Sequence, residues 1–243
     1  MELTNRDFIL YEDEEIIVCH KQAGIAVQTS RVGEEDLENI LKKYLKAPYL
    51  GVIHRLDQPV EGILAFAKTK QAAAKLSAQN KGDAMNKDYY AMAALAQPRE
   101  TGREYRLTDY LLKKGKGNIS QVVEAGAAGA KRAELAYQII DMAKRKEKTE
   151  SGIAREALVK IRLVTGRHHQ IRVQLSHAGL PLLGDRKYGN EISKNLSLKL
   201  GIRNVALCAY RLEFFHPSRG KRLAFEIEPC RIGFWSFFLP DNS

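Results

Sequence analysis

The stretch GVIHRLDQPVEGILAFAK, residues 51–68, decides the fold of this chain. A proline disfavours helix at the residue before it, so Pro59 after Gln58 predicts a turn directly after Asp57. Residues 62–68 form a short, largely apolar run, which is typical of a buried strand. The pattern therefore places Asp57 at the edge of a loop that leads into the core.

Outward from this stretch, short strands alternate with a few helices. In the segment 34–46, acidic residues precede lysines, as the dipole of a helix prefers. Thr69 can cap the segment 70–80, and Ile171 and Leu175 form one apolar face in the segment 168–178. Helices are expected at 34–46, 70–80 and 168–178. Strands are expected at 8–11, 16–20, 25–28, 62–68, 87–96, 120–123, 132–140, 157–164, 205–214 and 222–227, and an exposed, mobile loop at 144–152. Many short strands with few helices predict an α+β fold with a mainly antiparallel sheet.

The composition is that of one soluble folded domain, and the cytoplasm is its expected location. The 243 residues are 44% hydrophobic and 28% charged, and we treat residues 1–243 as a single domain. No apolar stretch approaches the ~20 residues of a membrane-spanning helix. The first residues lack the pattern of a secretion signal. The cysteines, an odd number at wide spacing, predict neither disulfides nor a thiolate zinc site.

The charge of the chain is positive and unevenly distributed. The formal net charge is +10. Residues 1–40 hold 3 basic and 10 acidic side chains, which leaves 36 basic and 19 acidic ones for residues 41–243. A basic surface attracts polyanions through counterion release, so RNA, DNA or an acidic membrane could be the partner. A basic but merely solvated surface is the alternative.

Five segments together resemble the RluA-type family of RNA pseudouridine synthases. HRLD at 54–57 with GILAFAK at 62–68 is similar to the family signature, and KDYYA at 87–91 is similar to its K-x-Y-x-A strand. TGRHHQIR at 165–172, GLPLLGD at 179–185 and YG at 188–189 follow in the family's order. KQAG at 21–24 and residues 207–217 add weaker matches. Each segment alone is common, whereas their order and spacing are specific.

The resemblance implies the reaction and the residues that perform it. A pseudouridine synthase detaches uracil from its ribose and rejoins it through carbon 5, with Asp57 as the nucleophile. Arg172 is the expected cationic partner of this carboxylate. Tyr89 is expected to position the base and to assist in removing the carbon 5 proton. Arg55 is the candidate that fills the space of the flipped base.

The resemblance also implies the partners. Further RNA or loop contacts are expected from His54, Arg167, His168 and Gln170. The substrate would be ribosomal or transfer RNA and the protein a monomer. No P-loop or dinucleotide fingerprint occurs, so no cofactor is expected. His168, His169 and His177 match no usual set of metal ligands, so no metal is expected either.

The chain departs from the family pattern beside the aspartate. The usual Thr-Ser before the glycine is Val60-Glu61, the usual proline of the first motif is Gln22, and a usual histidine is Gln174. These changes leave Asp57 and Arg172 in place. They affect the choice of substrate more than the reaction.

Two other functions compete with the isomerase. Taken singly, Asp57 could be an ordinary turn residue, Tyr89 a core aromatic and Arg172 a surface charge of a helix. A non-catalytic RNA-binding or assembly protein would use the same basic cleft without needing Asp57. A hydrolase built on His54 and Asp57 would need a nucleophilic Ser or Cys or a metal set, and neither accompanies these motifs.

Overall fold

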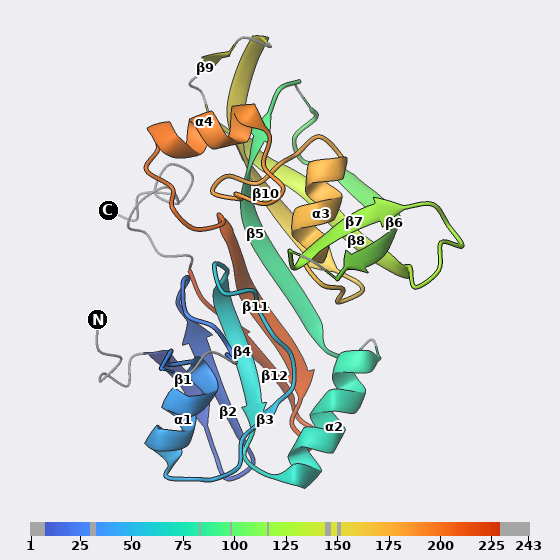
Figure 1. Cartoon of the computed structure of the whole chain (residues 1–243). Helices are drawn as coiled ribbons and strands as arrows, with labels where there is room; N and C mark the ends of the chain where they lie inside the picture. Colours follow the sequence, from blue (N-terminus) through green and yellow to red (C-terminus); the bar gives the residue numbers. More distant parts are fainter. Residues whose placement is uncertain are drawn as a thin grey trace. The chain divides into compact units, whose positions relative to one another are not determined.

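The computed structural model describes residues 8–29, 33–82, 84–97, 99–115, 117–143, 147–149 and 152–228 (Figure 1). These residues divide into two compact units. Unit 1 contains the residues up to Lys87 together with Ala209–Glu228, and unit 2 contains Asp88–Cys208. The chain passes into unit 2 near the start of one strand and returns to unit 1 near the start of another. Unit 1 is therefore built from two separate parts of the sequence.

Unit 1 is a sheet with two helices. In its strand order, β1, β2, β4 and β11 are neighbours, while β3 pairs with β4 and β12 with β11. The β1–β2, β2–β4, β3–β4 and β11–β12 pairs are antiparallel. The elements are β1 (Ile9–Glu12), β2 (Ile16–Lys21), α1 (Leu37–Leu45), β3 (Gly51–Val52), β4 (Glu61–Ala67), α2 (Lys70–Lys81), β11 (Leu207–Phe215) and β12 (Arg222–Glu226).

Strand β4 is the centre of unit 1, as its apolar sequence predicts. Every residue of β4 after Glu61 is buried. Ile63 and Ala65 pack in one core with Leu76 of α2 and Phe214 of β11. Gly62 has φ +144°, and a Cβ there would lie 2.5 Å from the Cβ of Ala209. Only glycine permits this backbone and this close approach of β11.

The helices of unit 1 begin at side-chain caps. The carboxylate of Asp36 accepts a hydrogen bond from the Asn39 N–H at 2.8 Å, and the Thr69 hydroxyl accepts one from the Ala72 N–H at 3.1 Å. Each bond satisfies a donor that the first helical turn leaves unpaired. The predicted cap at Thr69 is confirmed, and α2 ends one residue later than predicted.

Unit 2 is a second antiparallel arrangement of strands with two helices. Its strand order is β5, β10, β8, β6 and β7, and β9 pairs with β10. All these pairs are antiparallel. The elements are β5 (Asn86–Leu95), β6 (Glu104–Lys114), β7 (Ile119–Val123), β8 (Lys131–Met142), β9 (Glu147–Thr149), β10 (Gly152–Leu163), α3 (Gln170–His177) and α4 (Glu191–Lys199).

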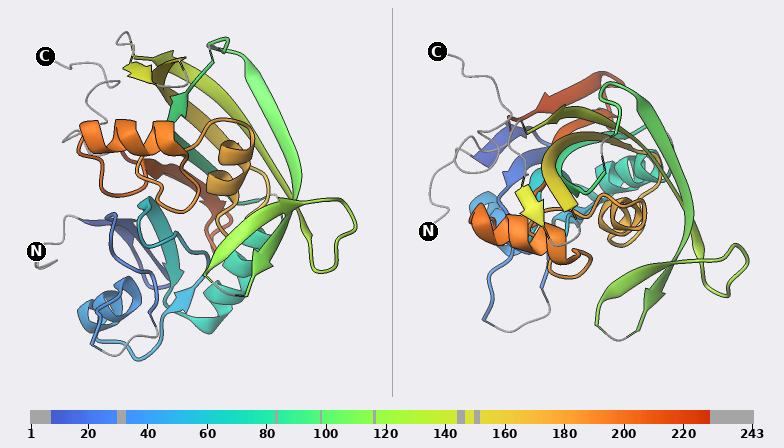
Figure 2. Two further views of the ribbon diagram at one scale, coloured as in Figure 1. Left: turned by 45° about the horizontal axis from the view of Figure 1, so that its top comes forward. Right: turned by 90° about the horizontal axis from the view of Figure 1, so that it is seen from above.

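Helix α3 packs against the β6, β7 and β8 part of unit 2. Val173 contacts Leu111 of β6 and Ala133 of β8 in one buried cluster, with Val122 of β7 beside them. Both views in Figure 2 show α3 next to these curved strands. The helix starts at Gln170, later than predicted, because His169 has a left-handed backbone with φ 54°. This packing fixes the position of α3 and therefore of the side chains that it carries.

The sequence predictions hold for the fold class and most elements. The sheet is mainly antiparallel and the fold is α+β. Four elements were not predicted: β3, β6, α4 and β9. The strand predicted over 25–28 does not form, and the carbonyl oxygens of Ala26 and Val27 instead accept hydrogen bonds from N–H groups at the start of α1. The helix predicted over 34–46 is shorter in the structure, at Leu37–Leu45. Residues 147–149 form β9 against Gly152–Ala154, so the prediction of a continuous loop over 144–152 was wrong there. Within the described ranges, no helix has the length and apolar character needed to cross a bilayer.

A buried polar cluster joins the β1–β2 turn to the β11–β12 turn in unit 1. Nε2 of His216 lies 2.7 Å from Oδ2 of Asp13, and the Tyr11 hydroxyl donates to the same oxygen at 2.8 Å. The N–H groups of Glu15 and Ile16 donate to Oδ1, each at 2.9 Å. Burial alone would raise the pKa of Asp13. Hydrogen bonds from Ile16, Glu15, Tyr11 and His216 outweigh it and lower the pKa to about 2.

This cluster predicts acid-sensitive stability. A carboxylate with a depressed pKa adds stability above its unfolded pKa of 3.8 and loses this contribution as the pH falls through about 2. Asp13→Asn should lower the unfolding free energy by up to about 2 kcal/mol near neutral pH. The difference from the parent should shrink by roughly half near pH 3.

Urea denaturation of the parent and of Asp13→Asn at both pH values measures this effect. Asp141→Asn, at an exposed aspartate of β8, is the matched control and should have little effect at either pH. A deficit of Asp13→Asn that stays constant between the two pH values would show that the carboxylate charge is not responsible.

Candidate functional site

The Asp57 loop connects β3 to β4 in unit 1. Asp57 is half-buried, and its backbone oxygen accepts a hydrogen bond from the Val60 N–H at 3.0 Å. This bond closes the turn that Pro59 predicts. Val60 is buried, so the loop is anchored immediately before β4. The loop thus presents a partly exposed carboxylate on a fixed backbone.

A buried lysine fastens this loop to the end of β2. Lys21 is 1% exposed, and its ammonium donates to the carbonyl oxygens of Gln22, Ile25 and Gln58 at 3.0, 2.8 and 3.1 Å. Gln58 follows Asp57 directly. Its backbone oxygen also accepts from the Gly24 N–H at 2.8 Å. Lys21 therefore determines where the Asp57 loop lies relative to β2.

Lys21 also supplies positive charge near the carboxylate. Burial lowers the pKa of Lys21 to about 8, while the negative charges of Asp57 and Glu61 favour its protonated form. An ionised aspartate in a site that excludes water needs such a cation nearby. This lysine belongs to the KQAG segment at 21–24, whose local pattern predicts no role for it. Lys21 lies near Asp57 because two segments that are far apart in the sequence come together in the fold. The local pattern does not reveal this contact.

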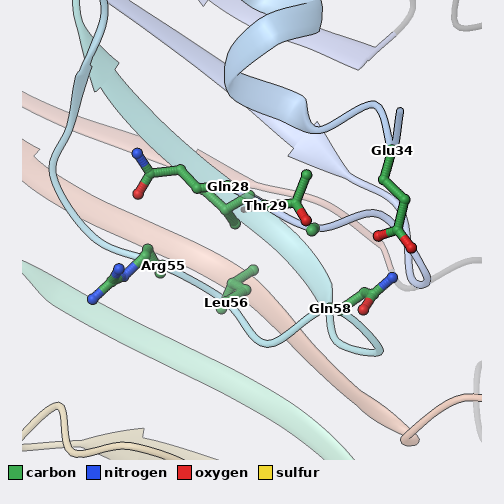
Figure 3. A pocket seen from close by; sticks show the side chains of 8 residues that line it. Gln28, Thr29, Glu34, Arg55, Leu56 and Gln58 are labelled. Atoms are coloured by element: carbon green, nitrogen blue, oxygen red, sulfur yellow. The ribbon is translucent and has the colours of Figure 1, made fainter. Parts of the chain in front are cut away.

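His54 and Arg55, which precede Asp57, differ in exposure. Nε2 of His54 accepts a hydrogen bond from the Ala65 N–H of β4 at 3.3 Å. Burial, and then the Lys87 ammonium, holds the pKa of His54 well below 6.5, which keeps the ring neutral and able to accept. His54 thus holds the loop on β4. Arg55 is exposed and lines a surface pocket (Figure 3).

The acid that departs from the family pattern has a partner of its own. Oε1 of Glu61 lies 2.8 Å from Nε2 of His20, on the neighbouring strand β2. Both side chains are mostly buried, with 13% and 25% exposure. The Glu61 side chain is therefore held in place beside β2.

Arg172 forms a buried ion pair in unit 2. Its Nε and Nη2 lie 2.7 and 2.8 Å from the two carboxylate oxygens of Asp185, and the side chains are 4% and 0% exposed. The N–H groups of Lys187 and Tyr188 donate to Asp185 Oδ1. The bidentate pairing fixes the plane of the guanidinium. The family-like segment at 179–185 ends at Asp185 but does not reveal this pairing.

Tyr188 joins the arginine to the start of α3. The Arg172 Cζ lies 5.1 Å from the centre of the Tyr188 ring. The Tyr188 hydroxyl lies 2.7 Å from Nδ1 of His169 and accepts from the Ser120 N–H at 2.8 Å. Aromatic contact with a guanidinium adds to its orientation. Tyr188, like Asp185, is a residue whose structural role the sequence motif alone did not reveal.

The remaining predicted residues of unit 2 lie on β5 and before α3. Tyr89 is 6% exposed and stands opposite Ile161 of β10. The Gln170 amide accepts from the Thr165 hydroxyl and the Arg167 N–H at 2.8 and 2.9 Å, and donates to the Glu134 oxygen at 3.0 Å. These bonds hold the loop before α3 on β8, which is one of the two roles considered for Gln170.

His168 and Arg167 reach neighbouring strands. Nδ1 of His168 lies 2.8 Å from the Ser120 hydroxyl and Nε2 lies 2.8 Å from Oδ1 of Asn118. Arg167 is exposed, and its Nε donates to the Arg132 oxygen at 2.9 Å. Both therefore position the loop before α3 against β7 and β8.

Each unit thus contributes one group of predicted residues. Unit 1 brings His54, Arg55 and Asp57 together on one loop. Unit 2 places Tyr89 on β5, and places Arg167, His168, Gln170 and Arg172 in and before α3. Their roles toward RNA stay predictions. Among the residues that the structure describes, no cluster of three or more His, Cys, Asp and Glu side chains suits a metal ion.

Comparison with known proteins gives a consistent result. The sequence pattern of a family described as RNA pseudouridylate synthase matches residues 15–177. An uncharacterized RNA pseudouridine synthase of Aquifex aeolicus is 33% identical over 241 residues, covering 90% of this chain and 68% of that protein. Ribosomal large subunit pseudouridine synthase C of Escherichia coli is 32% identical over 224 residues, covering 90% and 66%. The chain spans about two thirds of the length of these relatives.

The solved structures share the fold. Human RNA pseudouridylate synthase domain containing 1 superposes with a TM-score of 0.71 at 19% identity, covering 94% of this chain and 86% of that chain. Human RNA pseudouridylate synthase domain containing 4 gives a TM-score of 0.68 at 23% identity.

Proposed function

The chain belongs to the RNA pseudouridylate synthase family, and we propose that it isomerises specific uridines of large-subunit ribosomal RNA to pseudouridine. The observation that carries this proposal is the family match over residues 15–177, which includes the Asp57 loop, Tyr89 and Arg172. Relatives named as ribosomal large subunit synthases favour ribosomal over transfer RNA. The basic charge of residues 41–243 suits a polyanionic substrate.

The reaction needs only groups that this chain supplies. The bond between uracil N1 and the ribose breaks and a bond from carbon 5 to the same ribose carbon forms. The carbon 5 proton leaves to solvent, and N1 takes up a proton, so the product is an isomer of uridine. Asp57 acts as the nucleophile in this exchange. The Lys21 ammonium places positive charge near Asp57 and holds its loop. No change of oxidation state occurs, so no redox cofactor is required.

The other predicted residues serve orientation and proton transfer. Tyr89 offers a ring for stacking against uracil and a hydroxyl for the carbon 5 proton. Arg172 has its guanidinium plane fixed by Asp185. In the proposed function, this rigid cation stabilises the negative charge that develops on the reacting groups.

Mapping of pseudouridines tests the proposed substrate. Ribosomal and transfer RNA from cells with and without the gene would be sequenced after chemical labelling of pseudouridine. We expect one or more large-subunit pseudouridines to disappear with the gene and to return when it is restored. Loss confined to transfer RNA would contradict the ribosomal substrate. An unchanged map of both RNAs would contradict the proposed function.

A further inference from the structure

The Asp57 loop begins at a backbone oxygen that is held from the end of α2. Nδ2 of Asn80, in the last turn of α2, donates a hydrogen bond to the Ile53 oxygen at 3.1 Å. Ile53 directly follows β3 and is buried in the core of unit 1. The other end of the loop is held at the Gln58 oxygen by the Lys21 ammonium. The loop is therefore fastened at both ends, with Asp57 between them.

The Asn80 amide is oriented by Lys87, the second residue of β5. The Lys87 ammonium donates to Oδ1 of Asn80, while Nδ2 of the same amide faces the Ile53 oxygen. An amide carries an acceptor on one side and donors on the other, so only one of its two orientations makes both bonds. We call the series from Lys87 through Asn80 to the Ile53 oxygen the Asn80 tether.

The Lys87 cation is unfavourable for the stability of the fold. Lys87 is half-buried, and among the residues that the structure describes no carboxylate pairs with it. Burial lowers the pKa of Lys87 from 10.5 to about 8. A folded-state pKa below the unfolded value means that the charged form destabilises the folded chain near neutral pH. Because ionisable groups with strongly shifted pKa values cluster at functional sites, this cation indicates a role beyond folding.

Helix α2 has anchors other than the Asn80 tether. Thr69 caps its first turn, and Leu76 is buried in the core of unit 1. Gln79 binds the backbone of Phe215 twice: its Nε2 donates to the oxygen and its Oε1 accepts from the N–H, each at 2.7 Å. These contacts hold α2 in place, so the main effect of the tether falls on the loop.

We propose that Asn80 and Lys87 are positioning residues for the isomerisation, which hold the Asp57 loop where its carboxylate can reach the target uridine. The inference rests on the proposed function, because it concerns the residues that place the proposed nucleophile. A displacement of about 1 Å at a reacting group can slow a reaction by up to about a hundredfold. Neither residue touches the reacting atoms. Loss of the tether should therefore slow the chemical step and leave RNA affinity nearly unchanged.

Asn80→Asp removes one bond of the tether and keeps the other. Its carboxylate can still accept from Lys87 but has no N–H for the Ile53 oxygen. In a single turnover, the release of tritium from RNA labelled at uridine carbon 5 should slow by about tenfold or more. The dissociation constant for RNA should change by less than about twofold. Gln79→Glu is the matched control, because it makes the same chemical change at the next residue and removes the donor to Phe215. It should release tritium at the parental rate.

Lys87→Met distinguishes a positioning role from a purely structural one. Because it removes a desolvated cation, its midpoint of urea denaturation near neutral pH should be no lower than that of the parent. Its rate of tritium release should fall by about fivefold, because the Asn80 amide is no longer oriented. A midpoint below that of the parent would overturn the role of Lys87. A parental rate in either folded variant, or a fall in rate matched by a fall in RNA affinity, would overturn the proposal.

Amide hydrogen exchange separates this inference from the proposed function, because it needs no RNA. In Asn80→Asp, a peptide covering residues 53–60 should exchange at least about threefold faster than in the parent. The same peptide should exchange at the parental rate in Gln79→Glu. This result would support the tether even if the parent modifies no RNA and the proposed function fails. Equal exchange in the parent and in Asn80→Asp would overturn the inference whatever the enzymatic result.

Discussion

Asp57→Asn is expected to slow the release of tritium from RNA labelled at uridine carbon 5 by at least about a thousandfold. Asparagine keeps nearly the same shape, but its neutral amide is a far poorer nucleophile than a carboxylate. RNA binding should persist, because phosphate contacts supply most of the affinity. The substitution therefore separates chemistry from binding.

The experiment pairs tritium release with a binding assay and circular dichroism on the same preparations. Asp141→Asn makes the same chemical change at an exposed residue of β8 and should release tritium at the parental rate. A folded Asp57→Asn variant that is close to the parent in rate would exclude Asp57 as the nucleophile. Loss of RNA binding together with rate would instead assign Asp57 to the binding surface.

Arg172→Met is expected to lower the unfolding free energy by about 3–5 kcal/mol, because it leaves the Asp185 carboxylate buried without its cation. The Asp185 side chain has no exposed surface, and both of its carboxylate oxygens bond to the guanidinium. The double variant Arg172→Met with Asp185→Asn removes the stranded charge. Its amide oxygen can still accept from Lys187 and Tyr188. The double variant should therefore regain part of the loss.

Urea denaturation of the single and double variants measures both effects. Arg106→Met is the matched control in the same unit, because Arg106 pairs with Glu104 at 3.3 Å and both side chains are exposed, at 83% and 61%. This change should cost less than about 1 kcal/mol. A loss for Arg172→Met no larger than that of the control, or a double variant less stable than the single one, would contradict the assigned role of the pair.

The fold was largely predictable because most elements carry a strong local signal. The apolar run of β4 and the Thr69 cap of α2 are examples. β6 was not predicted because charged residues such as Glu104 and Arg106 alternate with side chains that are only partly buried. α4 was not predicted because Ser193 and Ser197 occupy much of its buried face, so the helix lacks an apolar stripe.

The candidate site was predictable in its motifs but not in its connections. Asp57 and Arg172 were chosen from sequence alone. That Lys21 bonds to the carbonyl next to Asp57, and that Asp185 pairs with Arg172, depends on contacts between separate segments. A single sequence gives the types of residue in a motif. It does not give the pairing between motifs.

The discontinuity of unit 1 has a consequence for synthesis on the ribosome. Residues 88–206 are all translated before β11, so the strands of unit 2 are available as a continuous segment. Apart from the short pairing of β3 with Phe66 and Ala67, the edge of β4 away from β2 must wait for β11. The core around Ile63 lacks Leu212 and Phe214 until then. Until β11 is made, the nascent chain exposes this edge of β4, which can pair with strands of other chains. Translation that stops before Ala209 therefore leaves a product prone to aggregation.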